Sequence, residues 1–86
     1  MNKLDELNVI KEYLLDEIHS LILQSDRQAE FARKGQVSEY VVNIIVNELK
    51  RREDQVRHML DNILQEIEKY KELKILFTEY KKINNE

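Results

Sequence analysis

The chain of 86 residues contains one glycine and no proline, cysteine or tryptophan, while 42% of its residues are hydrophobic and 36% are charged. So few turn residues argue against a β-sandwich or barrel. The lack of cysteine excludes a disulfide framework and a thiolate zinc site, and the hydrophobic fraction is too high for a disordered chain. What remains is an all-α, coiled-coil-like fold. The net charge of −3 is not the basic footprint of non-specific nucleic-acid binding.

A first helix is predicted over residues 3–34. Its apolar residues recur at spacings of three and four, the period of a helix with one buried face; they are Leu4, Leu7, Ile10, Leu14, Leu15, Ile18, Leu21 and Ile22. The helix should end at Arg33 and Lys34, because cations favour the negative end of the helix dipole and Gly35 readily takes a left-handed conformation. A capping-box spacing that starts at Ser25 leaves open whether this helix breaks there.

A tight turn at residues 35–37 and a second helix over residues 39–83 are predicted to follow. Ser38 is a good N-cap, because its hydroxyl can accept a hydrogen bond from a free N–H group of the first turn. Val37 and Val42 can form the hydrophobic staple around it. The two helices together predict one helical-hairpin domain over residues 1–86.

In the second helix, apolar residues recur every seven residues from Val42 to Phe77, with partners three residues further on, which is typical of a coiled-coil seam. The predicted core seam of the hairpin consists of Leu14, Ile18, Leu21, Val42, Ile45, Leu49, Val56, Met59, Ile63 and Tyr70. A further row of apolar residues widens this seam, and a lone hairpin cannot cover it. We therefore expect the chain to associate with itself, as a homodimer that forms a four-helix bundle.

The second helix is predicted to be longer than the first. At a rise of 1.5 Å per residue, the helices span about 45–50 Å and about 65–70 Å, so Leu14 should lie near His58 and Met59, and residues 71–86 should have no partner within the chain. This overhang carries an apolar stripe that we expect to bind either another subunit or a separate protein. The stripe consists of Leu73, Leu76, Phe77, Tyr80 and Ile83, and its flanking lysines are Lys69, Lys71, Lys74, Lys81 and Lys82.

The sequence shows no pattern of a catalytic site, because it has no glycine-rich phosphate loop, no cysteine nucleophile and no serine suitably spaced from a histidine and an acid. Asp16 with His19, and Asp54 with His58, each share a helix face, and such pairs can build a dinuclear metal site in a helical bundle. Both pairs fall outside the apolar seam. We therefore interpret the histidines as solvated surface residues and expect no metal and no cofactor.

The run from Phe31 to Ile45, FARKGQVSEYVVNII, resembles the turn and second helix of ribbon-helix-helix repressors and antitoxins, in which a short helix ends at glycine and a Ser-Glu-Tyr-Val start opens the next helix. The resemblance, taken over residues 31–49, implies a dimer that binds the DNA major groove through a paired N-terminal ribbon. The equivalent of that ribbon, around Tyr13–Ser20, has the pattern of a helix rather than a strand.

These patterns predict a non-catalytic protein–protein interaction module, a small oligomeric adaptor, inhibitor or regulator that acts through helical surfaces. The alternatives are a DNA-binding regulator or antitoxin of the ribbon-helix-helix type and, third, a bundle metalloprotein. The expected partners are a second copy and another protein, rather than nucleic acid or a membrane. The first residues lack the apolar segment of a signal peptide, and no window approaches 18 uninterrupted apolar residues, so a cytoplasmic location is expected.

Overall fold

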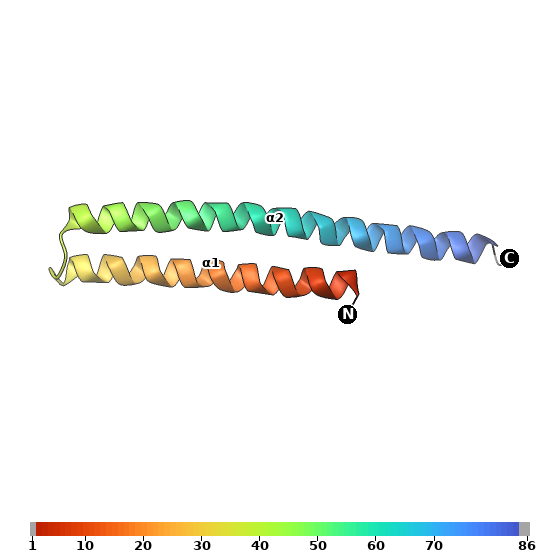
Figure 1. The fold of residues 1–86 in the computed structure, drawn as a ribbon, viewed down its shortest axis with the longest axis horizontal. Coiled ribbons are helices and arrows are strands. Elements are labelled where there is room, and N and C mark those ends of the chain that lie inside the picture. The colour runs from red at the N-terminus through yellow and green to blue at the C-terminus, as the bar shows by residue number, and fades with distance from the viewer. Residues whose placement is uncertain (1, 85–86) are drawn as a thin grey trace.

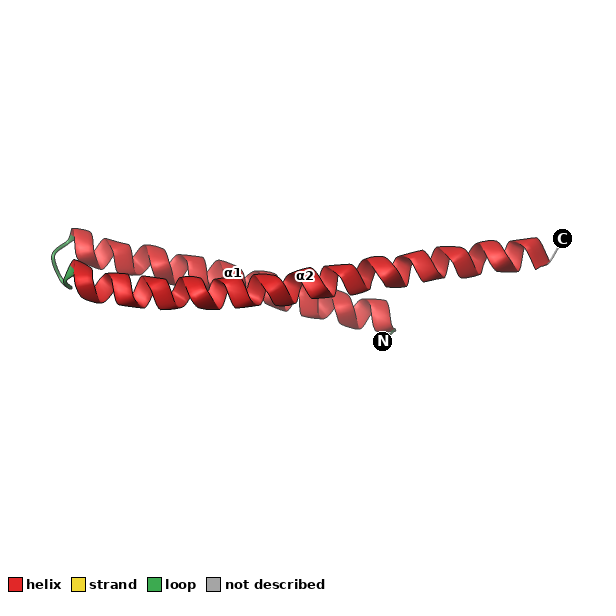
Figure 2. Ribbon diagram, turned by 90° about the horizontal axis from the view of Figure 1, so that it is seen from above, coloured by secondary structure: helices red, strands yellow, loops and turns green. Residues whose placement is uncertain are grey.

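The computed structural model describes residues 2–84, which form two helices joined by a short loop (Figure 1). Helix α1 spans Lys3–Arg33 and helix α2 spans Glu39–Asn84. The helices run antiparallel side by side and cross at a shallow angle, as Figure 2 shows, in a rod 73 Å long. The all-α helical hairpin predicted from the sequence is confirmed, with each predicted helix end within a residue of the observed one. Helix α1 continues through Ser25 without a break.

Both helices begin at a polar side chain that caps a free backbone N–H group. Before α1, the Oδ1 atom of Asn2 accepts a hydrogen bond from the Asp5 N–H at 2.8 Å. Before α2, the Oγ atom of Ser38 accepts one from the Val41 N–H at 3.3 Å. Each cap satisfies one of the donors that a helix start leaves unpaired, and the predicted role of Ser38 is confirmed.

The loop between the helices is a Schellman motif centred on Gly35. The Gly35 N–H donates to the Ala32 carbonyl oxygen and the Gln36 N–H donates to the Phe31 carbonyl oxygen, each at 3.0 Å. Gly35 has a φ of 70°, a left-handed conformation that side chains with a Cβ atom disfavour. The last carbonyl groups of α1 are thereby paired, and the chain reverses direction within five residues, 34–38.

The core of the hairpin is a single layer of apolar contacts between the two helices. Leu14 and Ile18 of α1 form a buried cluster with Leu60 of α2, and Val56 and Ile63 pack against it. Leu14 therefore meets a residue one position beyond the predicted pair His58–Met59. The buried apolar residues are Leu7, Leu14, Ile18, Leu21, Val42, Leu49, Leu60 and Ile67.

Most residues of the predicted core seam lie in this layer of contacts, but two residues of the seam do not. Ile45 and Met59 lie outside the contact between the helices, with exposed fractions of 36% and 49%. In their place, the row four residues after Val42 and Val56 is buried or half-buried from Val46 to Ile67, and it contains Leu60. Of the other predicted seam residues, Leu14, Ile18, Leu21, Val42 and Leu49 are buried, and Val56, Ile63 and Tyr70 are half-buried.

The difference between the two rows is one of charge. The row that contains Ile45 and Met59 also contains Arg52 and Glu66, so its burial would remove two charged side chains from water. Between Val46 and Ile67, the row that α1 covers contains a single charged residue, Glu53. Glu53 is half-buried, and it forms an ion pair with the Arg57 Nε atom at 2.7 Å. Helix α1 therefore packs on the row that costs less desolvation free energy.

Candidate protein-binding surface

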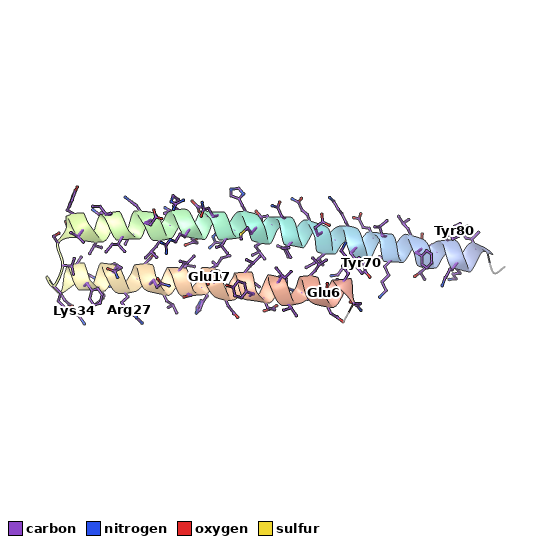
Figure 3. All side chains as sticks on the ribbon, viewed as in Figure 1. Glu6, Glu17, Arg27, Lys34, Tyr70 and Tyr80 are labelled. Atoms are coloured by element: carbon purple, nitrogen blue, oxygen red, sulfur yellow. The ribbon has the colours of Figure 1, made fainter. Side chains whose placement is uncertain are left out.

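Helix α2 extends well past the start of α1 and leaves a long single-helix overhang. Figure 3 places Tyr70 over the first turns of α1, close to Glu6, and Tyr80 far beyond them. Tyr70 is half-buried, whereas every residue from 71 to 83 is exposed. The predicted overhang of residues 71–86 thus begins where expected, and its last two residues lie outside the described part of the chain.

The predicted stripe lies on this overhang, at spacings of three and four residues along one face. Its members, Leu73, Leu76, Phe77, Tyr80 and Ile83, have exposed fractions between 58% and 71%. Side chains of Leu73, Leu76 and Phe77 line a shallow groove of about 590 Å³ together with Tyr70 and Lys74. The first part of the stripe therefore adjoins Tyr70, at the end of the hairpin core. Tyr80 and Ile83 continue the same face toward the C-terminus.

Positive charge borders the stripe, as predicted. Lys74 lies in the wall of the groove, and the Lys81 Nζ atom lies 4.9 Å from the centroid of the Phe77 ring. At that distance the ammonium group is attracted by the electrons of the ring face. On the inner side, the Lys69 Nζ atom is 3.6 Å from a carboxylate oxygen of Glu66. An acidic partner could therefore contact both the apolar face and its basic border.

A second groove, of about 480 Å³, lies where α1 begins, and no residue of the predicted stripe lines it. Leu4 of α1 and Ile75 of α2 are its apolar side chains, and it is also lined by Lys71, Lys74, Thr78 and Glu79. Ile75 is one of the apolar residues of the overhang, but it was left out of the predicted stripe because it lies off the seven-residue repeat. The signal that could have found it is the apolar Leu4 at the open end of the hairpin, which needs an apolar neighbour on α2.

A third groove, of about 270 Å³, lies near the closed end of the hairpin on α2. It is lined by Ile44, Ile45, Glu48, Leu49 and Arg52. Glu48 accepts a hydrogen bond from the Arg51 Nε atom at 3.1 Å and lies 3.7 Å from the Arg52 Nε atom. The hydrogen bond from Arg51, with the positive charges of both arginines, holds the pKa of Glu48 below its ordinary value of 4.5.

The two histidines lie apart from these grooves. His19 and His58 are both exposed, as are Asp16 and Asp54, which share their helix faces. Within the described residues, no three side chains of His, Cys, Asp or Glu are grouped so that they could hold a metal ion.

The resemblance to ribbon-helix-helix proteins is limited to the loop and the start of α2. The stretch that would supply the DNA-binding ribbon, Tyr13–Ser20, lies in the middle of α1. The glycine and the Ser38 start have a local explanation in this structure, because they end one helix and cap the next.

Neither helix, over the described residues, combines the length and the apolar character needed to cross a lipid bilayer. Comparison of the chain with protein-family models, with curated protein sequences and with solved structures found no match.

Proposed function

We propose that this chain is a non-catalytic protein–protein interaction module, a small oligomeric adaptor, inhibitor or regulator that binds through the apolar face of its α2 overhang. The observation that carries the proposal is the exposure of Leu73, Phe77 and Tyr80 on one face of the part of α2 that α1 does not reach. Contiguous exposed apolar surface of this kind is typical of interaction sites. An isolated helix of this length is marginal in water, so a partner would also stabilise it.

The mode of binding that this surface suits is a helix lying in a groove. Apolar residues at spacings of three and four present a continuous ridge, and the lysines beside it favour a partner with acidic residues at the rim of its groove. The cytoplasmic location expected from the sequence belongs to this proposal, and fractionation of the source cell tests it.

The experiment compares three tagged proteins: the wild type, a Leu73→Asp/Phe77→Asp variant, and a Gln65→Asp control that adds a charge to the exposed Gln65, outside the stripe. Each is used to capture proteins from extracts of the source cell, and the captured proteins are quantified by mass spectrometry. We expect the wild type and the control to retain the same proteins and the stripe variant to lose them. Far-UV circular dichroism verifies that all three remain helical.

Identical capture by all three proteins would contradict the proposal. So would retention of the wild type on DNA that weakens steeply with salt, because that behaviour is the mark of phosphate binding and would favour the ribbon-helix-helix alternative.

A further inference from the structure

One row of residues on α2, which we call the outer row, lies outside the contact between α1 and α2. Its members recur every seven residues and therefore lie on one face of the helix: Ile45, Arg52, Met59, Glu66, Leu73 and Tyr80. All six are exposed. Met59 is the midpoint of this row. Arg52 and Glu66, which have opposite charges, lie seven residues before and seven residues after it. Ile45 and Leu73, which are both aliphatic, lie 14 residues before and 14 residues after Met59.

We propose that the overhang stripe is covered by a second copy of this chain, with α2 antiparallel to α2 and the two-fold axis passing at Met59. In this register Arg52 of each copy faces Glu66 of the other, and Ile45 faces Leu73. The inference rests on the proposed function, since it names the occupant of the same surface. A two-fold axis makes each of these pairs occur twice.

A neighbouring row of α2 agrees with the same register. Glu48 comes close to Lys69 of the second copy, and Val41 comes close to Leu76. Opposite charges therefore meet along the middle of the contact, and apolar residues meet at both ends. The side chains of Arg52, Glu66 and Lys69 are all more than half exposed in the hairpin, and their ion pairs with Glu48 and with each other lie on the surface, so a second copy can contact all three.

The groove near the closed end of the hairpin is the place where the overhang would bind. It offers the apolar side chains of Ile44 and Ile45 next to the carboxylate of Glu48. An apolar stripe bordered by Lys69 and Lys74 matches that combination. The overhang, which lacks a neighbouring helix in its own chain, would then lie against the two-helix end of the other copy.

Parallel arrangements of two copies bring like charges together. In a parallel pair, Arg52 faces Arg52, and Glu66 faces Glu66. Pairing the overhangs alone, in parallel, places Lys69 beside Lys74 of the other copy. Like charges facing one another disfavour a helix pair, so this charge pattern favours antiparallel over parallel pairing.

Single cysteine substitutions test the register, because the natural chain has no cysteine. Met59→Cys should form a disulfide-linked dimer rapidly in a glutathione redox buffer, since position 59 meets its own copy at the axis. Leu73→Cys should not link to itself, because the two copies of position 73 would be about 42 Å apart along the helices. An equimolar mixture of Ile45→Cys and Leu73→Cys should form the mixed dimer.

Charge reversal provides an independent test. Sedimentation equilibrium of the wild type should give a dimer, and Arg52→Glu or Glu66→Arg should each weaken it about tenfold, as expected for two repeated surface ion pairs turned repulsive. The double variant Arg52→Glu/Glu66→Arg should restore the affinity, because the pairs are then re-formed with exchanged signs. Gln65→Glu, at an exposed position outside the outer row, is the control and should leave the affinity unchanged.

Three results would overturn the inference. They are a monomer at every concentration, self-linking of Leu73→Cys as fast as that of Met59→Cys, and failure of the double reversal to restore the dimer. A monomer that still captures a cellular protein through its stripe would leave the proposed function standing without the inference. A monomer that captures nothing would refute both.

Discussion

The backbone N–H of Gln36 donates to the carbonyl oxygen of Phe31 at 3.0 Å, across the left-handed residue Gly35. This hydrogen bond closes α1 and sets the direction in which the chain returns. A Cβ atom added at Gly35 would meet no heavy atom within 4 Å other than those of its chain neighbours, so the backbone conformation alone restricts the residue there.

Gly35→Ala should therefore lower the free energy of unfolding by about 1–2 kcal/mol, the cost of a left-handed conformation for a residue with a Cβ atom. Gly35→Asn is the matched control and should lose less, since asparagine tolerates this region. Urea unfolding followed by circular dichroism measures both. An equal loss in the two variants would mean that the side chain, rather than the backbone angle, determines the effect.

Leu14→Ala should lower the free energy of unfolding by about 2–5 kcal/mol, because Leu14 is buried against Ile18 and Leu60 and its loss leaves a cavity. Leu23→Ala removes the same atoms from an exposed position of the same helix and should change it by no more than about 0.5 kcal/mol. Unfolding curves at one fixed protein concentration measure the difference. Equal effects would place the core of the hairpin elsewhere.

Glu48 should titrate below pH 4.5 in the folded chain, because the Arg51 hydrogen bond and the nearby arginine charges favour its carboxylate form. A lowered pKa contributes stability that is present above about pH 4.5 and is lost as the pH falls through the folded value. Glu48→Gln should thus lower the thermal midpoint at pH 7 and approach the wild type in strong acid. A carboxyl titration by NMR, in which Arg51→Gln raises the pKa again, verifies the cause.

The double variant His19→Ala/His58→Ala should keep the free energy of unfolding within about 0.5 kcal/mol of the wild type, since both side chains are exposed. Elemental analysis of the purified protein is the accompanying measurement. Stoichiometric iron, manganese or zinc that disappears in the variant would contradict our interpretation of the histidines as solvated surface residues.

The helices and their ends could be predicted because their determinants are local. Gly35 and Ser38 act on backbone groups within a few residues, and the apolar period needs no knowledge of the partner helix. The face that α1 covers is different, because α2 carries apolar residues both three and four positions after Val42 and Val56. Choosing between Ile45 and Val46 requires the charge carried by each whole row, which a local pattern does not weigh.

The candidate site divides in the same way. The stripe from Leu73 to Ile83 follows from helix lengths alone, so it could be predicted before the structure. The groove formed by Leu4 and Ile75 could not, because it depends on the turn of the helix at which α1 begins to cover α2. The groove around Ile45 and Glu48 also required the structure, since the predicted seam placed Ile45 inside the core.

The rod measures 73 × 18 × 15 Å and has a radius of gyration of 20.7 Å, whereas a compact protein of this length would have about 12 Å. In gel filtration such a particle elutes ahead of compact standards of equal mass, so a single chain would be taken for a larger assembly. Antiparallel pairing at Met59 would double the mass and hardly lengthen the particle, so the dimer would be less elongated for its mass than the single chain. Elution volume calibrated on compact standards would therefore overstate the mass of the single chain, and light scattering or native mass spectrometry would give the number of copies directly.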